Sequence, residues 1–398
     1  MAAGTVAEPD GRPAGPAGPS RPVQLIVAIA AMMAVAAVVA LAIAHATSWR
    51  LPVLALVGSG LGFVLFQATF GFAGSFRAAL ERRDCSGFRA QALALGLTSC
   101  VFFPLLTVGE LFGLPLTGFV TPIGVSFVIG AVLFGIGMQI GGGCASGTLF
   151  ALGGGNARLL MTLACFIVGS AVGAAHLGFW WTLPVLPTGT SQDWLGWPAA
   201  LTLHLSVFAG VIIYAPASDR LRRGLKGGLT WRRWLREPWP LAWGAAGLAL
   251  LNIATLVLAG RPWGETAGFT LWGSKLAAMI GFEPAGWPYW QGDPGSLARS
   301  IFSDVTSVMD FAIIAGAAAA AGWSGRFALR AGGDGRAWLG AMLGGFLMGY
   351  GARLSDGCNI GAYFSALASG SLSGWVWVAA AFLGSAIGLK LRPLFHLT

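Results

Sequence analysis

The sequence has few charged residues. Of its 398 residues only 10% are Asp, Glu, Lys or Arg, whereas 56% are hydrophobic. Soluble domains usually carry about 25% charged residues, so this balance excludes an ordinary water-soluble fold. Apolar runs of roughly 17 to 25 residues, long enough to cross a bilayer, recur along most of the chain. The composition therefore predicts an all-α integral membrane protein with one membrane domain, whose surroundings are the lipid bilayer.

Residues that build metal and redox centres are also scarce. The four histidines are scattered, and the five cysteines include no CxxC pair, so we predict no metal site and no cofactor. A Walker motif, a nucleophile elbow and paired catalytic carboxylates are missing. The glycine clusters lie inside apolar spans and not in the βαβ unit that a dinucleotide fingerprint requires. We therefore do not predict an enzyme.

The basic excess has a simple explanation in a membrane protein. A formal net charge of +9 would suit a nucleic-acid partner in a soluble chain. In a membrane protein it indicates cytoplasmic loops that face anionic lipid and follow the positive-inside bias. We predict no nucleic-acid partner.

Breaks at Pro, Gly and charged clusters divide the apolar sequence into about ten spans. They are predicted near residues 23–47, 51–73, 90–108, 120–140, 159–183, 199–216, 239–260, 303–322, 337–353 and 372–391. Residues 1–22 are rich in Pro, Gly and Ala and predict a disordered cytoplasmic tail. Residues 23–50 then hold an extra, uncleaved span, with a cleaved signal peptide as the alternative. Residues 51–216 and 239–398 form two halves, joined by a basic cytoplasmic linker at 217–238.

The distribution of basic residues predicts the orientation. If the N-terminus is cytoplasmic, nineteen of the twenty-four Lys and Arg residues lie in inner segments. Only four lie in outer segments: Arg50, Arg261, Lys275 and Arg299. The positive-inside rule therefore predicts that both termini face the cytoplasm and that the chain crosses the membrane many times.

A glycine-rich segment around a cysteine occurs twice. "GIGMQIGGGCASGTLFAL" at 135–152 matches "GYGARLSDGCNIGAYFSAL" at 349–367 at an offset of 214 residues. The identities include five glycine pairs and one cysteine pair: Gly130/Gly344, Gly135/Gly349, Gly137/Gly351, Gly143/Gly357, Gly147/Gly361 and Cys144/Cys358. The predicted spans before the two cysteines run in opposite directions. We therefore predict inverted repeats, an arrangement typical of transporters and some channels.

Each cysteine is predicted to begin a re-entrant half-helix. The runs after Cys144 and Cys358 are too short to cross the membrane, and irregular backbone at membrane depth is tolerated only where protein or a cavity surrounds it. A helix N-terminus presents free N–H groups and partial positive charge, so it attracts anions. A thiol adds a soft donor or a sulfur that exchanges. Buried packing is the alternative for these two cysteines, and we assign it to Cys85, Cys100 and Cys165.

Other residues near the two cysteines complete the predicted substrate pathway. They are Gly143, Gly357, Ser146, Asn359, Gln139 and Arg353. Ser146 and Asn359 either donate hydrogen bonds to a substrate or cap the half-helices. Arg353 either attracts an anion, as intramembrane charges often do, or forms a local ion pair with Asp356. The sequence leaves these alternatives open.

The motifs "GGGCASG" and "DGCNIGA", with "RPWGETAGFTLWGSKL" and "SDVTSVMDFAIIAGAAAAA", resemble the YeeE/YedE family of sulfur-transport membrane proteins over roughly residues 51–392. The resemblance implies uptake of thiosulfate or a related sulfur anion across the bacterial inner membrane, through a pathway lined by cysteines, with Cys144 and Cys358 in that role. The family often has a third cysteine in a segment resembling "FGFAGSFR", where Ala73 stands here.

Three functions follow from these patterns. The first is a permease for thiosulfate or a similar small sulfur anion. The second is a sulfur-handling protein in which a cysteine persulfide passes sulfur to a cytoplasmic acceptor protein. The third is an aquaporin-like channel for small neutral solutes, which also uses opposed half-helices.

Overall fold

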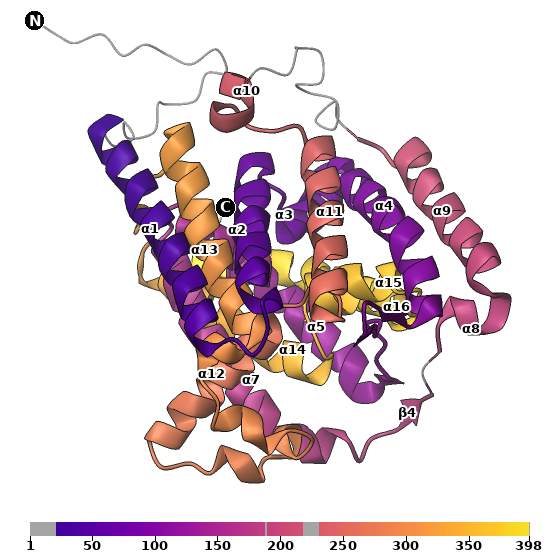
Figure 1. The fold of residues 1–398 in the computed structure, drawn as a ribbon. Helices are drawn as coiled ribbons and strands as arrows, with labels where there is room; N and C mark the ends of the chain where they lie inside the picture. The colour runs from indigo at the N-terminus through magenta and orange to yellow at the C-terminus, as the bar shows by residue number, and fades with distance from the viewer. Residues whose placement is uncertain (1–20, 188, 218–230, 398) are drawn as a thin grey trace, which may run out of the picture.

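A computed structural model describes residues 21–187, 189–217 and 231–397, which form a mainly helical body (Figure 1). The first part of the chain forms α1 (Arg21–His45), α2 (Arg50–Ala68), α3 (Phe72–Arg82), α4 (Ser86–Val108), α5 (Val125–Ile140), α6 (Ala145–Gly153), α7 (Arg158–Trp180), α8 (Ser191–Leu195) and α9 (Trp197–Tyr214). The second part forms α10 (Trp231–Arg236), α11 (Leu241–Ala259), α12 (Thr266–Met279), α13 (Val305–Ser324), α14 (Gly335–Leu354), the π-helix η6 (Asn359–Ser365), α15 (Ala366–Ala368), α16 (Ser373–Leu391) and the 3-10 helix η7 (Arg392–Phe395).

Short elements fill the connections between the long helices. Two antiparallel pairs of two-residue strands join β1 (Glu110–Leu111) to β2 (Leu114–Pro115) and β3 (Ile123–Gly124) to β4 (Val185–Leu186). Four 3-10 turns follow α12: η2 (Pro284–Gly286), η3 (Pro288–Trp290), η4 (Pro294–Leu297) and η5 (Ile301–Ser303).

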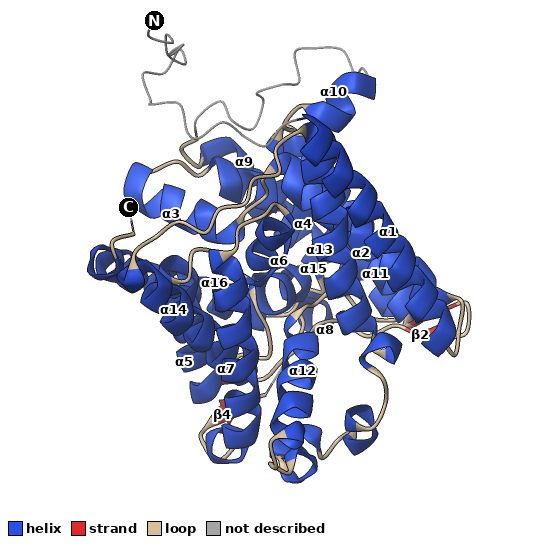
Figure 2. Cartoon of the chain, turned by 90° about the vertical axis from the view of Figure 1, so that its left-hand side faces the viewer, coloured by secondary structure: helices blue, strands red, loops and turns tan. Residues whose placement is uncertain are grey.

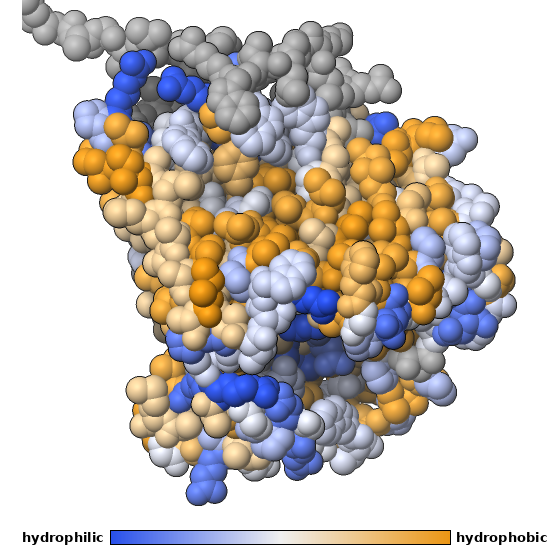
Figure 3. Space-filling view, viewed as in Figure 1, coloured by the Kyte–Doolittle hydropathy of each residue, from blue (hydrophilic) through white to orange (hydrophobic). Residues whose placement is uncertain are grey.

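The helices confirm an all-α integral membrane protein. Among the described residues, nine stretches are long and apolar enough to cross a membrane. The one predicted span that is not among these nine, near 337–353, forms the 20-residue helix α14. Its many glycines and two arginines lower its hydropathy. Figure 3 shows hydrophobic residues across the middle of the body and hydrophilic residues towards its two ends, as expected for a protein surrounded by lipid.

Two parts of the chain depart from the predicted spans. The span predicted at 51–73 is two helices, because α2 ends at Ala68 and Thr69 has a left-handed φ of 49°. The new helix α3 then begins at Phe72. Helix α12 was not predicted, since its 14 residues are too few to span a bilayer. In both places a long helix ends, and a shorter helix begins a few residues later.

Most of two predicted polar segments lies outside the described residues. Of the predicted tail at 1–22, residues 1–20 are outside the description, and Arg21 already belongs to α1. Of the predicted linker at 217–238, residues 218–230 are outside it, and α10 follows them. The division of the chain into two halves therefore stays a prediction.

Glycines allow α5 and α14 to touch backbone to backbone. A Cβ added to Gly130 would lie 2.6 Å from the carbonyl oxygen of Gly351, and one added to Gly137 would lie 2.7 Å from that of Gly344. Contacts this short leave no room for a side chain. Because the lower-numbered residue of α5 meets the higher-numbered residue of α14, the two helices cross antiparallel.

The same contacts are reciprocal under the repeat offset. The offset of 214 carries Gly130 onto Gly344 and Gly137 onto Gly351, so each pair maps onto the other. A second set of contacts matches once a one-residue insertion in the second half is allowed, since Phe166 then corresponds to Ala381. A Cβ added to Gly135 would lie 2.3 Å from the carbonyl oxygen of Ala381, and one added to Gly349 would lie 2.1 Å from that of Phe166. A two-fold relation produces such contacts. The inverted repeat stays a prediction, which this pattern supports.

Candidate functional site

Cys144 lies where the sequence predicts it, directly before a short helix. It is the N-cap of α6, with extended backbone (φ −84°, ψ −172°). Its Sγ accepts a hydrogen bond from the N–H of Gly147 at 3.4 Å and lies 3.5 Å from the hydroxyl of Ser146. Only 1% of its surface is exposed. The thiol therefore faces the free N–H groups of a helix start inside the body of the protein.

Cys358 has the matching position in the second half. It is the N-cap of η6, and its Sγ accepts a hydrogen bond from the N–H of Ile360 at 3.4 Å. It is also 1% exposed. The helix that it begins is a π-helix, a conformation found mostly as single turns and often at functional sites. In Figure 2, α6 and α15, which follows η6, lie near the centre of the body.

A carboxyl group that sequence reasoning missed contacts one of the two thiols and acts electrostatically on the other. The Cys358 thiol donates a hydrogen bond to Oε2 of Glu265 at 3.8 Å. Glu265 is 1% exposed and also interacts electrostatically with the Cys144 thiol. The backbone of Ala73, the residue in the place of the family's third cysteine, hydrogen-bonds to Cys144. The structure thus brings together Cys144, Cys358, the start of α3 and the start of α12.

A small cavity reaches Cys144 from one end of the molecule. Its volume is about 180 Å³. Its wall includes three of the predicted residues, Cys144, Gln139 and Gly143, and two arginines, Arg77 and Arg392. Gln139 donates a hydrogen bond from Nε2 to the carbonyl oxygen of Ala73 at 3.2 Å. The cavity therefore joins a buried thiol to positively charged side chains.

Arginine side chains lie in and beside the wall of this cavity. The guanidinium of Arg392 donates to the carbonyl oxygen of Gln139 at 2.8 Å. The charges of Arg77 and Arg158 both act on Arg392, with Glu81 as the acidic neighbour. A basic wall raises the local concentration of small anions. The cavity suits an anion more than a neutral solute.

We expect Arg77→Gln to lower uptake of a divalent anion at concentrations below saturation. Loss of one charge near the cavity removes about 1 kcal/mol of attraction, which is roughly a fivefold fall in rate. The effect should shrink at high salt, because screening weakens the charge that was lost. Initial rates at two ionic strengths measure it. Arg83→Gln serves as the control, because Arg83 is an exposed arginine at the end of the same helix, α3. Equal losses of uptake in both variants would contradict a role for the cavity charge.

Arg353 makes contacts that the sequence does not predict. Its guanidinium donates to the hydroxyls of Thr266 at 2.7 Å and Tyr289 at 2.9 Å, and it lies over the ring of Tyr289. Among the described residues no direct salt bridge joins Arg353 to Asp356, although the charge of Arg353 acts on the Asp356 carboxyl. The Arg353 side chain reaches across to α12 and η3. Attraction of an anion by Arg353 stays a prediction.

Asp356 has a backbone role instead. It adopts a left-handed φ of 55°, and Gly142, its equivalent in the first half, has a φ of +88°. Aspartate tolerates this conformation better than most side chains. Both residues turn the chain just before the Gly-Cys pair, so the charge difference between the halves leaves the turn unchanged.

The remaining predicted residues are buried beside the half-helix starts. Asn359 is fully buried, and neither atom of its side-chain amide has a hydrogen-bond partner in the described structure. Gly357 packs closely, since an added Cβ would lie 2.8 Å from the N of Ala362. An unpartnered buried amide costs free energy, which suits a group that binds something polar during function.

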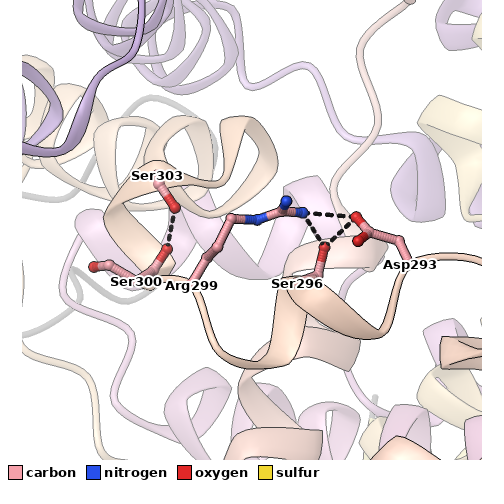
Figure 4. A network of polar contacts seen from close by, with 5 residues as sticks. All are labelled: Asp293, Ser296, Arg299, Ser300 and Ser303. Carbon is pink, nitrogen blue, oxygen red and sulfur yellow. Dashed lines mark hydrogen bonds and ion pairs between the residues drawn. The ribbon is translucent and has the colours of Figure 1, made fainter.

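A second hollow lies at the other end of the molecule, beside the loop that carries η4 and η5. Its volume is about 480 Å³, and its wall includes Arg50, Arg261, Arg299 and Asp304. Figure 4 shows that the Arg299 guanidinium and the Ser296 hydroxyl both bind Asp293, with Nη2 of Arg299 at 2.6 Å. These two contacts, the hydroxyl first, hold the pKa of Asp293 below its usual range. The wall residues include three of the four predicted outer basic residues.

The other cysteines lie apart from this site. Cys100 is exposed and Cys165 is half-buried on the long helices α4 and α7. Cys85 lies between α3 and α4, and burial followed by the charge of Asp84 raises the pKa of its thiol. A raised pKa favours the unreactive thiol form.

Comparisons with known proteins identify the family of the chain. Residues 67–387 match the model of a family described as Sulphur transport. The chain is 28% identical over 334 residues to the "Thiosulfate transporter TsuA" of Spirochaeta thermophila, a match that covers 81% of this chain and 92% of that protein. It is 27% identical over 348 residues to the protein of the same name from Escherichia coli K12, covering 83% and 91%.

A third relative matches over a shorter region. The "Probable transporter YedE" of Escherichia coli K12 is 29% identical over 166 residues, which is 41% of each chain. The match thus spans about two fifths of that protein. By contrast, the family model spans both cysteine half-helices, the break before α3 and the whole of α12. The chain therefore belongs to the sulphur transport family.

Proposed function

We propose that this protein imports thiosulfate or a related small sulfur anion across the bacterial inner membrane, through a central pathway lined by Cys144 and Cys358. The observation that carries the proposal is the pair of buried thiols at two helix starts, with an arginine-walled cavity reaching one of them. Helix starts favour anions, and thiols donate hydrogen bonds to sulfur or oxygen. The thiosulfate transporters among the relatives support the choice of anion.

The two cysteines follow one another along the proposed route. Arg77, Arg158 and Arg392 lie in segments whose basic residues predict the cytoplasmic side, so the cavity at Cys144 is the inner one. The anion would pass Cys358 first and Cys144 second. The half-helix N-termini supply positive potential on both sides of the narrow centre, where both thiols are buried. Such a centre admits a small anion with little of its hydration shell.

The two other functions fit the described residues less well. A persulfide relay needs a thiol that a soluble acceptor can reach, whereas both cysteines are 1% exposed. A channel for neutral solutes gains nothing from the arginines around the inner cavity. Mass spectrometry of the purified protein would detect the added sulfur of a persulfide on either cysteine.

The test is uptake of labelled thiosulfate into cells that lack their own uptake system. We expect saturable uptake, with sulfate, sulfite and dithionate tested as competitors to define the anion. Vector-only cells give the background rate. Uptake no faster than that background, in cells that contain the folded protein, would contradict the proposal.

A further inference from the structure

The further inference rests on the proposed function and concerns what drives it. Imported thiosulfate carries two negative charges, and the cytoplasm is electrically negative. Inward movement is therefore opposed by the membrane potential. Accumulation requires a cation that moves with the anion, so the interior of the protein must hold a group that carries it.

Two buried carboxyl groups lie beside the cysteine site. Glu265 directly precedes α12, and Asp310 lies in the second turn of α13. Their exposed fractions are 1% and 0%. In the described part of the chain, neither carboxyl oxygen of Asp310 has a hydrogen-bond partner. Oε1 of Glu265 also has none. An ionised carboxylate without a partner in an apolar interior is prohibitively unfavourable, so such a group is neutral and holds a proton.

The carboxyl of Asp310 points at the start of α12, where Glu265 lies. Oδ2 of Asp310 would be 2.8 Å from a Cβ added to Gly268, one turn after Glu265. Glycine at that position gives the carboxyl its room. The two acids interact electrostatically, and Glu265 in turn accepts the hydrogen bond of the Cys358 thiol. A proton on this pair therefore lies next to the predicted path of the anion.

Asp304 connects the pair to the outer hollow. It caps α13 by accepting hydrogen bonds from the N–H and the hydroxyl of Ser307, at 2.7 and 2.8 Å. It also lines the hollow at the predicted outer end, and its charge acts on Asp310. Asp304, Asp310 and Glu265 thus form a row of carboxyl groups that leads from the outer hollow to Cys358.

No basic side chain neutralises the row within the described residues. The nearby arginines are engaged elsewhere: Arg261 donates to Thr306 at 3.0 Å, and Arg353 donates to Thr266 and Tyr289. Lys275 of α12 donates to two backbone oxygens of the outer loop. Of the other helices packed on α13, α1 and α2 carry charged or titratable side chains only near their ends, namely Arg21, His45 and Arg50, and α6 carries none. The short helix α10 also contains Arg232, Arg233 and Arg236.

We propose that Glu265 and Asp310 form the proton site that couples anion uptake to the proton gradient. Protons enter from the outer hollow by way of Asp304, bind the two carboxyl groups and accompany the dianion inward. Two carboxyl groups match the two charges of thiosulfate, so the complete step moves no net charge. No covalent bond of the substrate changes.

The test uses the full chain in sodium-free proteoliposomes with a pH-sensitive dye inside. External thiosulfate should acidify the lumen with wild-type protein, and an inward proton gradient should drive accumulation of labelled thiosulfate. Glu265→Gln and Asp310→Asn should each reduce that accumulation at least tenfold. They should still exchange labelled for unlabelled thiosulfate at equal pH, because exchange needs no net proton movement. Glu283→Gln, at an exposed loop carboxyl, should behave as wild type.

The alternative outcomes each contradict something definite. Unchanged accumulation in both variants, absence of acidification, or accumulation that needs sodium would overturn the coupling site. Loss of exchange as well as accumulation in a folded variant would assign these residues to anion binding and not to coupling. If wild-type vesicles exchange no thiosulfate, the proposed function fails and the coupling proposal fails with it.

Discussion

Cys358→Ser is expected to reduce thiosulfate uptake by roughly ten- to a hundredfold, and Cys144→Ser by a similar factor. A hydrogen bond to a charged group contributes about 1.5–3 kcal/mol, which corresponds to that range of rates. Serine keeps a donor, but its oxygen is smaller, harder and less polarizable than sulfur. Initial rates of labelled thiosulfate uptake, normalised to the amount of protein in the membrane, measure the effect.

Serine makes this a clean test because it preserves the fold. Each cysteine is an N-cap that accepts a hydrogen bond from the following turn, and serine is a better N-cap than most residues. Cys100→Ser and Cys165→Ser, at the two cysteines on long helices, should leave uptake unchanged. Normal uptake in both Cys144→Ser and Cys358→Ser would rule out the thiol mechanism while leaving transport intact.

Gly349→Ala is expected to destabilise the folded protein by about 1–3 kcal/mol or more, the usual range for overpacking. The added Cβ would lie 2.1 Å from the carbonyl oxygen of Phe166. Because that neighbour is backbone, relief requires helices α14 and α7 to move apart. Gly135→Ala should have a similar effect, since its added Cβ would lie 2.3 Å from the oxygen of Ala381. Thermal stability in detergent, followed by size-exclusion chromatography, gives the measurement.

Gly210→Ala is the matched control for these two variants. Gly210 also lies inside a long helix, α9, but no atom lies within 4 Å of its added Cβ. Alanine has the higher helix propensity, so stability should stay the same or rise by up to about 1 kcal/mol. If Gly349→Ala and Gly210→Ala melt at the same temperature, the backbone contacts at Gly349 do not support the fold.

The long helices could be predicted because a bilayer demands long apolar runs, and the half-helix starts because a Gly-Cys pair interrupts such a run. The break after Ala68 gave no such signal. The residues around it, "FQATFGFAGSF", remain apolar through the break, so hydropathy reads one span from 51 to 73. The left-handed turn at Thr69 depends on packing that a single sequence does not reveal.

The site was predictable only where it repeats. Cys144 and Cys358 emerged because they match each other across the two halves. Glu265 and Asp310 lie inside two segments that resemble the family, but Glu265 has no acidic counterpart in the first half and Asp310 lies in an apolar run rich in alanine, so neither stood out as a site residue. The contacts of Arg353 were hidden for another reason. Thr266 and Tyr289 are 87 and 64 residues away along the chain, and only the fold brings them together.

The glycine crossing of α5 and α14 limits how the protein can move. Interfaces that slide usually do so by re-packing a layer of side chains. In this crossing backbone meets backbone at Gly130–Gly351 and Gly137–Gly344, with the side chains of Leu354 and Met348 beside the contacts. A shift of one helical turn would drive neighbouring side chains into the opposite chain. We therefore expect α5 and α14 to move together as one rigid frame. Under the proposed function, opening would then come from small displacements of the short elements α6 and η6, so we expect gating at the two cysteines and not a sliding of α5 past α14.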